Sequence, residues 1–208
     1  IAPFINPQRH SLFKEKHLRD VLPENNRKMT IIPQLLHTTE DDFVILCKRL
    51  EDFGYTHVNW NLGCPFPMVA KKGRGSGMLP HPGRIDAFLD EVVPAVPNAL
   101  SIKTRLGRYH ADEMAEIMPI FNRYPLASVI VHPRTGVQMY GGAPDLGAFS
   151  WCLENCRHPV IYNGDIIDLS GFQELERRFK GVAGWMMGRG VLANPFLPGL
   201  LKHAPPPD

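Results

Sequence analysis

The residues His57-Val-Asn-Trp-Asn-Leu-Gly63 lead directly into Cys64-Pro-Phe-Pro67. Apolar and polar residues alternate from 57 to 62, which is the pattern of a β-strand. Gly63 ends this pattern, and the two prolines require a loop after it. The stretch therefore predicts a strand that presents one thiol at its end. Free cysteine is among the most buried residue types, so the stretch alone leaves inert packing and chemistry as two open interpretations.

Similar strand patterns recur at a steady interval along the chain. Successive candidate strands begin 27, 42, 29, 31 and 25 residues apart. A (β/α)₈ barrel of roughly 250 residues has about 31 residues in each unit, so this interval favours that fold. The candidate strands are Thr30–Leu36, His57–Gly63, Ala99–Leu106, Ser128–Arg134, Pro159–Asp165 and Gly184–Gly190.

The segments between these strands have the apolar periodicity of amphipathic helices. The first opens with a capping signal at Thr38-Thr39-Glu40 and ends at Gly54. Alternating strands and helices predict a parallel sheet with right-handed crossovers. The apolar stripes of three helices consist of Phe43, Leu46, Cys47, Leu50 and Phe53, of Met114, Ile117 and Phe121, and of Phe172, Leu175 and Phe179.

We therefore predict an α/β fold of the TIM (β/α)₈-barrel type. A doubly wound open sheet is disfavoured, because no G-x-G-x-x-G follows an early strand. Counting Ile1–Ile5 as a strand gives seven strands, one short of a closed barrel. We expect an incomplete barrel over residues 1–200, with its first strand absent, and the proline-rich end of a fragment at 201–208.

The composition is that of a soluble globular protein. The 208 residues carry a formal net charge of +2, and 44% are hydrophobic and 21% charged. No apolar run is long enough to span a bilayer, and the first residues lack the pattern of a signal peptide. The four cysteines form no C-x-x-C pair, which favours packing over a metal site. We expect a reduced, cytoplasmic protein with no metal. The cysteines are Cys47, Cys64, Cys152 and Cys156.

Polar residues end every candidate strand. Active sites of TIM barrels lie at the carboxyl ends of the strands, so these residues are predicted to share one rim. Amides, a cation near a ring and a phosphate cradle at the last strands favour a phosphorylated, ring-bearing cofactor. The residues are Gln34, Asn61 with Cys64, Lys103 with Arg105, His132 with Arg134, Asn163 with Asp165, and Arg189 between Gly188 and Gly190.

Each of these residues also has a structural interpretation when it is taken alone. Asn163-Gly-Asp165 is a turn or helix-start signal, and Gly188-Arg-Gly190 suits a tight turn. His132 is equally a hydrogen-bonded core histidine. Lys103 and Arg105 form the kind of pair that often joins surface ion pairs.

Basic residues follow the cysteine at Lys71, Lys72 and Arg74. Such a run is most often a solvated surface. It indicates a nucleic-acid partner only if it shares one face with Cys64.

Six motifs follow one another along nearly the whole chain. They are Asn61-Leu-Gly-Cys-Pro65, Lys71-Lys-Gly-Arg-Gly-Ser76, Lys103-Thr-Arg105, His132-Pro-Arg-Thr-Gly-Val-Gln-Met-Tyr-Gly-Gly-Ala143, Asn163-Gly-Asp165 and Gly188-Arg-Gly-Val-Leu-Ala-Asn-Pro195. Each motif alone is weak. Together, and in this order, they resemble the tRNA-dihydrouridine synthases, and the ordered set is highly specific.

The resemblance implies an FMN-dependent barrel that reduces the 5,6 double bond of particular uridines in tRNA, with NADPH restoring the flavin. By the same resemblance, hydride passes from flavin N5 to C6 of the uracil while Cys64 protonates C5. The implied cofactor-binding residues are Gln34, Lys103, His132, Asn163, Gly164, Asp165, Gly188 and Arg189. The implied substrate-binding residues are Asn61, Lys71, Lys72, Arg134, Gln138 and Tyr140.

This chemistry sets expectations for the site. A proton must quench the enolate-like charge at C5, so Cys64 must be a neutral thiol without a strongly lowered pKa. Lys103 would lie near the N1–C2 edge of the flavin and stabilise its negative charge. A target uridine must be splayed out of the folded tRNA, which places its phosphates near Lys71, Lys72 and Arg74.

The chain also departs from the pattern of the family. By the resemblance, the first strand, which contacts the flavin through its backbone, and the C-terminal helical domain, which grips tRNA, are absent. Residues 1–200 are thus interpreted as a truncated, flavin-binding catalytic barrel. Ala143-Pro-Asp-Leu replaces a common Ala-Asp-Trp, and Gly77 replaces a common alanine.

Two other functions stay open from the sequence. One is an FMN-dependent oxidoreductase on a free pyrimidine, similar to dihydroorotate or dihydropyrimidine dehydrogenase. The basic loop and the His-x-Arg-Thr segment disfavour it, because they favour RNA over a free base. The other is a non-catalytic barrel that binds tRNA without flavin.

Overall fold

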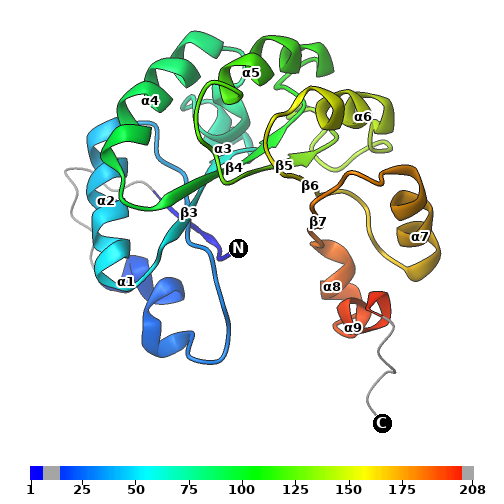
Figure 1. Ribbon diagram of the computed structural model, residues 1–208, viewed down its shortest axis with the longest axis horizontal. Coiled ribbons are helices and arrows are strands. Elements are labelled where there is room, and N and C mark those ends of the chain that lie inside the picture. Colours follow the sequence, from blue (N-terminus) through cyan, green and yellow to red (C-terminus); the bar gives the residue numbers. More distant parts are fainter. Residues whose placement is uncertain (7–14, 203–208) are drawn as a thin grey trace.

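Seven parallel strands form a curved sheet in the computed structural model, which describes residues 1–6 and 15–202 (Figure 1). Neighbours in the sheet are also neighbours in the chain, as in a TIM barrel. This confirms the predicted fold class; residues 203–208 of the expected proline-rich end lie outside the described residues. The strands are β1 (Phe4–Ile5), β2 (Gln34–Leu35), β3 (His57–Leu62), β4 (Ala99–Arg105), β5 (Ser128–His132), β6 (Val160–Tyr162) and β7 (Gly184–Trp185).

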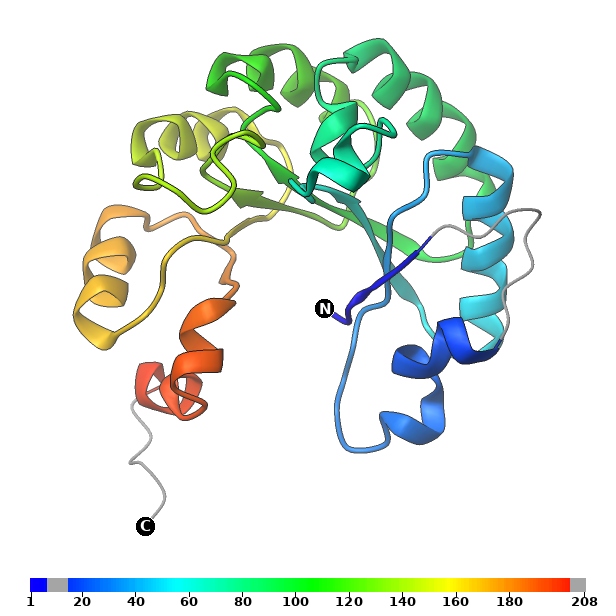
Figure 2. The same ribbon diagram turned by 180° about the vertical axis from the view of Figure 1, so that it is seen from behind.

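Helices cover the outer, convex face of the sheet, as the view from behind in Figure 2 also shows. Every described helix is too short or too polar to span a bilayer. The long helices are α2 (Glu40–Asp52), α4 (Pro82–Ala95), α5 (Met114–Phe121), α6 (Leu146–Asn155) and α7 (Leu169–Arg178). Short helices are α1 (Glu15–Leu18), α3 (Pro67–Ala70), α8 (Arg189–Ala193) and α9 (Leu197–Leu201), with 3₁₀ turns at η2 (Arg19–Val21), η3 (Pro23–Asn25), η4 (Gly75–Met78) and η5 (Ala111–Glu113).

Helix α2 shows how these helices form. Its apolar stripe is fully buried, from Phe43 to Leu50. Three acidic residues, 40–42, occupy its first turn, where the helix dipole favours negative charge. Thr39 is the N-cap residue, but its side chain makes no capping hydrogen bond. The helix stops before Gly54, which has a φ of +88°, a backbone conformation that glycine adopts without strain.

Side chains on β3 alternate between the two faces of the sheet. Trp60 packs against the helices, and its ring stacks on Phe88 of α4 with centroids 4.1 Å apart. Asn61 lies on the other, concave face and is paired in register with Lys103 of β4. Arg105 follows Lys103 by two residues and shares this face, as predicted. The strand register therefore brings polar side chains from neighbouring strands together.

The last strand is shorter than predicted. β7 ends at Trp185, and Met186 N still donates to Tyr162 O at 2.8 Å. Gly188 then adopts φ −124° and ψ −96°, which turns the chain into α8. The second half of the predicted strand Gly184–Gly190 is therefore wrong, because residues 189 and 190 are helical.

The other six strands are also shorter than predicted, β3 and β4 by one residue and β1, β2, β5 and β6 by more. The strand expected at 30–36 reduces to β2, because Pro33 has no backbone N–H to give to a ladder. The strand expected at 159–165 ends at Tyr162, and its last residues form a loop. Gln34 is the first residue of β2, whereas Asn163 directly follows β6.

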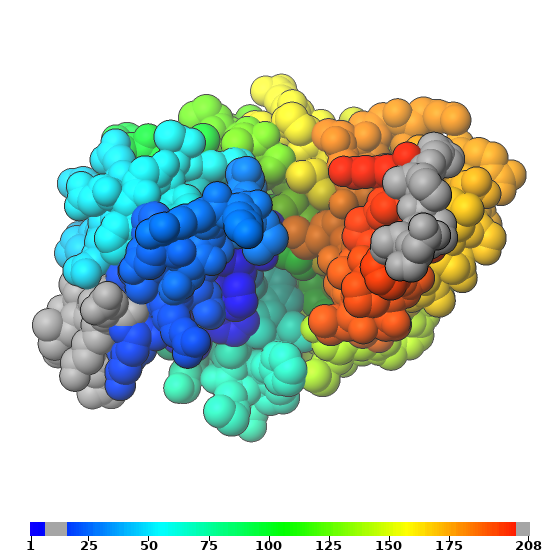
Figure 3. Space-filling view, turned by 90° about the horizontal axis from the view of Figure 1, so that it is seen from below, coloured from blue at the N-terminus to red at the C-terminus, as the bar shows by residue number. Residues whose placement is uncertain are grey.

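The sheet is open between β1 and β7, its two edge strands. Figure 3 shows the surface hollowed between the N-terminal segment, in blue, and the C-terminal helices, in orange and red. Phe4 of β1 and Arg189 of α8 line the same cavity from opposite ends of the sheet order. The curvature of the sheet thus joins residues from both ends of the described chain.

Gly190 allows α8 to pack closely on the loop after β6. A Cβ atom at this position would lie 2.1 Å from the carbonyl oxygen of Ile166. We expect Gly190→Ala to lower the free energy of unfolding by about 1–3 kcal/mol, because backbone atoms must move apart. Urea denaturation measures this change. Gly83→Ala in α4 is the matched control, since no atom lies within 4 Å of its added Cβ. Equal stability of the two variants would contradict the close packing.

Candidate active site

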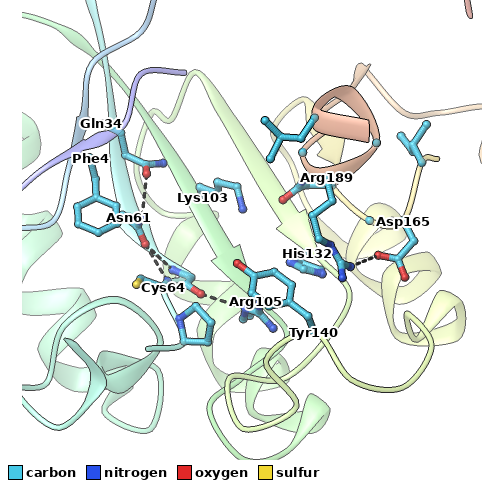
Figure 4. Close-up of a pocket in the computed structure, with 18 of the residues that line it drawn as sticks. Phe4, Gln34, Asn61, Cys64, Lys103, Arg105, His132, Tyr140, Asp165 and Arg189 are labelled. Carbon is cyan, nitrogen blue, oxygen red and sulfur yellow. Dashed lines mark hydrogen bonds and ion pairs between the residues drawn. The ribbon is translucent and has the colours of Figure 1, made fainter. Parts of the chain in front are cut away.

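A cavity of about 360 Å³ lies at the carboxyl ends of the strands (Figure 4). Its size falls in the range of small-molecule sites. Most of the predicted site residues line it, although they come from distant parts of the chain. These are Gln34, Asn61, Cys64, Lys103, His132, Tyr140, Asn163, Gly164, Asp165, Gly188 and Arg189.

Hydrogen-bonded amides form the wall at β2 and β3. Gln34 Nε2 donates to Asn59 Oδ1, and Asn61 Nδ2 donates to Gln34 Oε1, both at 2.7 Å. Asn61 Oδ1 accepts from the backbone N–H groups of Gly63 and Cys64 at 3.0 and 2.9 Å. Asn61 therefore holds the turn that presents the cysteine, which is a local side-chain-to-backbone motif that asparagine favours.

The thiol of Cys64 lies in this wall and is only 7% exposed. Burial raises the pKa of the Cys64 thiol, and the nearby charges of Arg105 and Lys103 offset only part of the rise. The thiol is therefore protonated at neutral pH. The glycine-rich segment after it packs closely, because a Cβ on Gly75 would lie 2.7 Å from Cys64 O.

Lys71 and Lys72 do not line the cavity. Both side chains are exposed, and Lys71 is the C-cap residue of α3. They begin the segment whose Ser76 donates from both its backbone N–H and Oγ to Cys64 O at 3.0 Å. The two lysines are thus tied to the Cys64 loop through the backbone, while their charges face solvent.

Lys103 on β4 is the register partner of Asn61 on the neighbouring strand β3. Burial, followed by the charge of Arg105, lowers the pKa of its ammonium group to about 8. A group with this pKa is charged at neutral pH, but burial and the charge of Arg105 make its charged form less favourable than in water. An anion in the cavity would relieve that cost.

Arg105 stood at a predicted strand end but had no predicted role in the site. The structure places it in the cavity wall with 2% of its surface exposed. Its Nε donates to Gly63 O at 3.0 Å, and its Nη1 donates to Thr135 O and Met139 O at 2.9 and 2.6 Å. Arg105 thereby joins the Cys64 loop to the loop after β5, residues 133–145. Its position at a predicted strand end and its even spacing with Lys103 signalled this placement.

Arg134 does not line the cavity, and its predicted contact with substrate stays a prediction. It is 1% exposed and donates to both carboxylate oxygens of Asp165, at 3.0 and 2.5 Å. Its other donors reach the carbonyl oxygens of Gly141 and Gly142. A buried guanidinium needs such partners. Arg134 therefore shapes the 133–145 loop from inside the protein.

Asp165 lines the cavity as predicted, but its carboxylate is already engaged. Arg189 Nη2 lies 2.6 Å from Asp165 Oδ1, the oxygen that also accepts from Arg134 Nη1. Hydrogen bonding from Arg134 lowers the pKa of this carboxyl group, with smaller contributions from the charges of Arg134 and Arg189. A bare carboxylate repels a phosphate, so Asp165 orients Arg189 rather than contacting an anion itself.

His132 is neutral in this setting. Its Nε2 lies 3.1 Å from Arg134 Nη1, and arginine can only donate. The ring proton is therefore assigned to Nδ1. Burial, followed by the charges of Arg105 and Lys103, lowers the pKa of His132 to about 3.

Tyr140 stands at the mouth of the cavity on the 133–145 loop and is 45% exposed. The guanidinium carbons of Arg105 and Arg189 lie 5.4 and 4.8 Å from its ring centroid, within cation–π range. Gln138, two residues earlier, is exposed and lies outside the cavity wall. Its Oε1 instead accepts from Thr135 N at 2.6 Å, which supports the loop.

Backbone forms much of the wall at the last strands. Asn163 Nδ2 donates to Met186 O at 2.8 Å and so ties the end of β6 to β7. Gly164 is packed tightly, because a Cβ there would lie 2.2 Å from the Tyr162 hydroxyl. Gly188 has open space, with no atom within 4 Å of an added Cβ. This end of the cavity therefore has open space beside the guanidinium of Arg189.

The cavity wall is positive and partly apolar. Lys103, Arg105 and Arg189 face a single carboxylate, Asp165, among the residues that line it. Such a wall attracts anions. Within the described residues, no three His, Cys, Asp or Glu side chains gather as a metal site would require. Apolar lining that the sequence analysis missed comes from Phe4, Phe66, Ile166, Ile167 and Leu192.

We expect Arg105→Met to loosen the 133–145 loop and to raise the pKa of Cys64, because a nearby positive charge is lost. Hydrogen exchange of residues 135–140 should become faster. The midpoint of the pH profile for alkylation of Cys64 by iodoacetamide should move upward. Arg189→Met is the control, since it removes a cation that does not contact the Cys64 loop. An unchanged profile and unchanged exchange in Arg105→Met would show that Arg105 does not hold the two loops together.

The chain matches a known family over almost its whole length. The family model described as Dihydrouridine synthase (Dus) matches residues 2–206. A "Probable tRNA-dihydrouridine synthase" of Staphylococcus aureus is 32% identical over 154 residues, which are 71% of this chain and 46% of that protein. A "Probable tRNA-dihydrouridine synthase 1" of Synechocystis sp. is 32% identical over 194 residues, 90% of this chain and 54% of that protein. The chain thus spans about half the length of these curated relatives.

A solved structure shares the fold at low sequence identity. It is a mutant of morphinone reductase in complex with tetrahydroNAD, with a TM-score of 0.56 and 16% identity. The match covers 85% of this chain and 52% of that chain. At this identity the likeness shows the fold alone.

Proposed function

This chain belongs to the dihydrouridine synthase family, and on that premise we propose that it takes part in the FMN-dependent reduction of uridines in tRNA to dihydrouridine. NADPH is the proposed reductant. The main support is a protonated thiol, Cys64, in the wall of a positive cavity that also offers amide and apolar surface. All four cysteines are free, which suits a reducing, cytoplasmic setting.

The cavity wall suits FMN. Apolar surface for a flat ring system comes from Phe4, Ile166 and Leu192, and polar partners for its edge come from Gln34 and Lys103. At the last strands, the open space beside Gly188 and the guanidinium of Arg189 suit a phosphate. When bound, FMN would supply the hydride for C6 of the uracil ring.

Cys64 is the proposed general acid. As its S–H bond breaks, a C5–H bond forms and takes up the electron pair left on C5 of the uracil. The remaining thiolate is then reprotonated from solvent. The raised pKa of Cys64 keeps the proton on sulfur until it is needed. Asn61 contributes by holding the turn that carries the thiol.

The tRNA would approach the mouth of the cavity. Tyr140 is exposed there and is the proposed contact for the target uridine. Lys71 and Lys72 are exposed on the segment tied to the Cys64 loop, where they would contact phosphates. Arg134 and Gln138 support this side of the mouth by shaping the 133–145 loop.

The direct test uses tRNA that lacks dihydrouridine. The protein is incubated with this tRNA, FMN and NADPH. The tRNA is then digested to nucleosides, which are separated and identified by mass spectrometry. We expect uridine to be converted to dihydrouridine. Activity on free uracil or orotate alone would replace the proposal with a free-pyrimidine oxidoreductase. A colourless protein that binds tRNA without turnover would point to a non-catalytic barrel.

We expect Cys64→Ala to retain FMN but to slow the single-turnover reduction of tRNA by about 10²–10⁴-fold, the usual cost of a lost general acid. Rapid quenching of enzyme preloaded with reduced FMN measures the rate. Cys156→Ala is the matched control, because this cysteine is half-buried at the end of α6 and is not in the cavity wall. An unchanged rate in Cys64→Ala removes Cys64 from the mechanism.

Binding of FMN should weaken as the pH rises above about 8, because Lys103 then loses the charge that an anionic ligand favours. Below that pH the lysine is charged and the affinity should level off. Lys103→Met should bind FMN more weakly at pH 7 and lose this pH dependence. Quenching of FMN fluorescence gives the affinities, with Lys72→Met as a control outside the cavity. A pH dependence that survives in Lys103→Met assigns it to another group.

A further inference from the structure

A second hollow, here called the rim groove, lies beside the cavity at the carboxyl ends of the strands. Its volume is about 550 Å³. It is formed between the loop after β4 and the 133–145 loop after β5, so it occupies the face that carries Cys64. Its lining includes Tyr109, Asp112, Thr135, Val137, Gln138 and Asp145.

The two loops of the rim groove are fixed to each other. Val137 N donates to Arg108 O at 3.0 Å. Glu113 accepts hydrogen bonds from the three successive backbone N–H groups of residues 108–110, at 2.8, 2.7 and 2.9 Å. The groove is therefore preorganised, so a ligand would not have to order it.

The rim groove exposes surface on which a nucleobase can stack. The Tyr109 side chain is 56% exposed and Val137 is 51% exposed. The guanidinium carbon of Arg108 lies 5.8 Å from the Tyr109 ring centroid. Aromatic rings and arginine planes of this kind are the usual stacking partners of unpaired RNA bases.

Two hydrogen bonds connect the rim groove to the surroundings of the cavity. Arg108 Nη1 donates to the carbonyl oxygen of Pro65, the residue after Cys64, at 3.3 Å. Thr135, in the groove, is joined through its carbonyl oxygen to Arg105 of the cavity wall at 2.9 Å. Arg105 and Arg108 therefore connect the rim groove to the cavity wall and to the Cys64 loop.

We propose that the rim groove binds the base of a nucleotide adjacent to the target uridine, with Tyr109 as the stacking platform. This inference rests on the proposed function, since it takes a uridine of an RNA strand as the occupant of the cavity. Gln138 supplies a polar contact to the base edge. Its Oε1 is held by Thr135 N, which leaves the Nε2 group to donate outward.

Charge indicates that a base, and not a phosphate, occupies the rim groove. The carboxylates of Asp112 and Asp145 line it and repel phosphate. Arg108 directs its Nη1 to Pro65 O and Ser76 Oγ. Contact through a stacked base predicts a contribution to affinity that changes little with salt, unlike a phosphate contact.

The experiment compares a fluorescein-labelled pentauridylate with UMP as ligands of the full protein loaded with FMN. In Tyr109→Ala, we expect pentauridylate affinity to fall by about 5- to 100-fold, the effect of losing one stacked base. UMP affinity should stay unchanged, because a single nucleotide needs only the cavity. Tyr109→Phe should retain wild-type affinity, since it keeps the ring. The loss in Tyr109→Ala should be the same at low and high salt, whereas Lys72→Ala should reduce the salt slope.

Each outcome decides the inference. Unchanged pentauridylate affinity in Tyr109→Ala overturns it, and so does an equal loss for both ligands, which would mark a general effect on the fold. Loss of affinity for pentauridylate alone, restored by Tyr109→Phe, supports it. Formation of dihydrouridine in tRNA by the wild-type protein is measured separately, so a failed proposed function is distinguished from a failed rim groove.

Discussion

Two buried arginine side chains, at and just beyond the ends of β4 and β5, hold the candidate active site together. Arg105 and Arg134 are 2% and 1% exposed, and backbone carbonyl groups take up most of their donors. Arg105 links the Cys64 loop to the 133–145 loop, and Arg134 anchors the same loop to Asp165. A buried guanidinium is costly without partners, so each arginine forces the loops into the geometry that satisfies it.

The same concentration of positive charge sets the chemistry of the cavity. It lowers the pKa of Lys103 and of His132, both already lowered by burial, so the histidine is neutral while the lysine is charged near neutral pH. The pKa of Cys64 is raised in spite of these charges, because burial dominates. A cavity that keeps a thiol protonated and still attracts anions suits proton donation to a substrate bound beside a phosphorylated cofactor.

In the proposed function, the rim around the cavity recognises RNA through both charge and stacking. Lys71 and Lys72 present exposed charge next to the Cys64 loop, whereas the rim groove presents the ring of Tyr109 among carboxylates. Loops on a rigid barrel vary easily without loss of the fold, which explains how a structure of 16% identity shares this architecture while the rim is free to differ.

The sequence by itself determined the fold class and most of the cavity wall. Strand periodicity and spacing placed Asn61, Lys103 and His132 at strand ends, and parallel strands put those ends on one rim. Only the tertiary structure decided what each side chain does there. Arg134 and Asp165 are paired across 31 positions of sequence, and Gly188 bends the chain into a helix where a strand was expected. Such outcomes depend on which donors and acceptors meet after folding, and local periodicity carries no information about partners so distant in the chain.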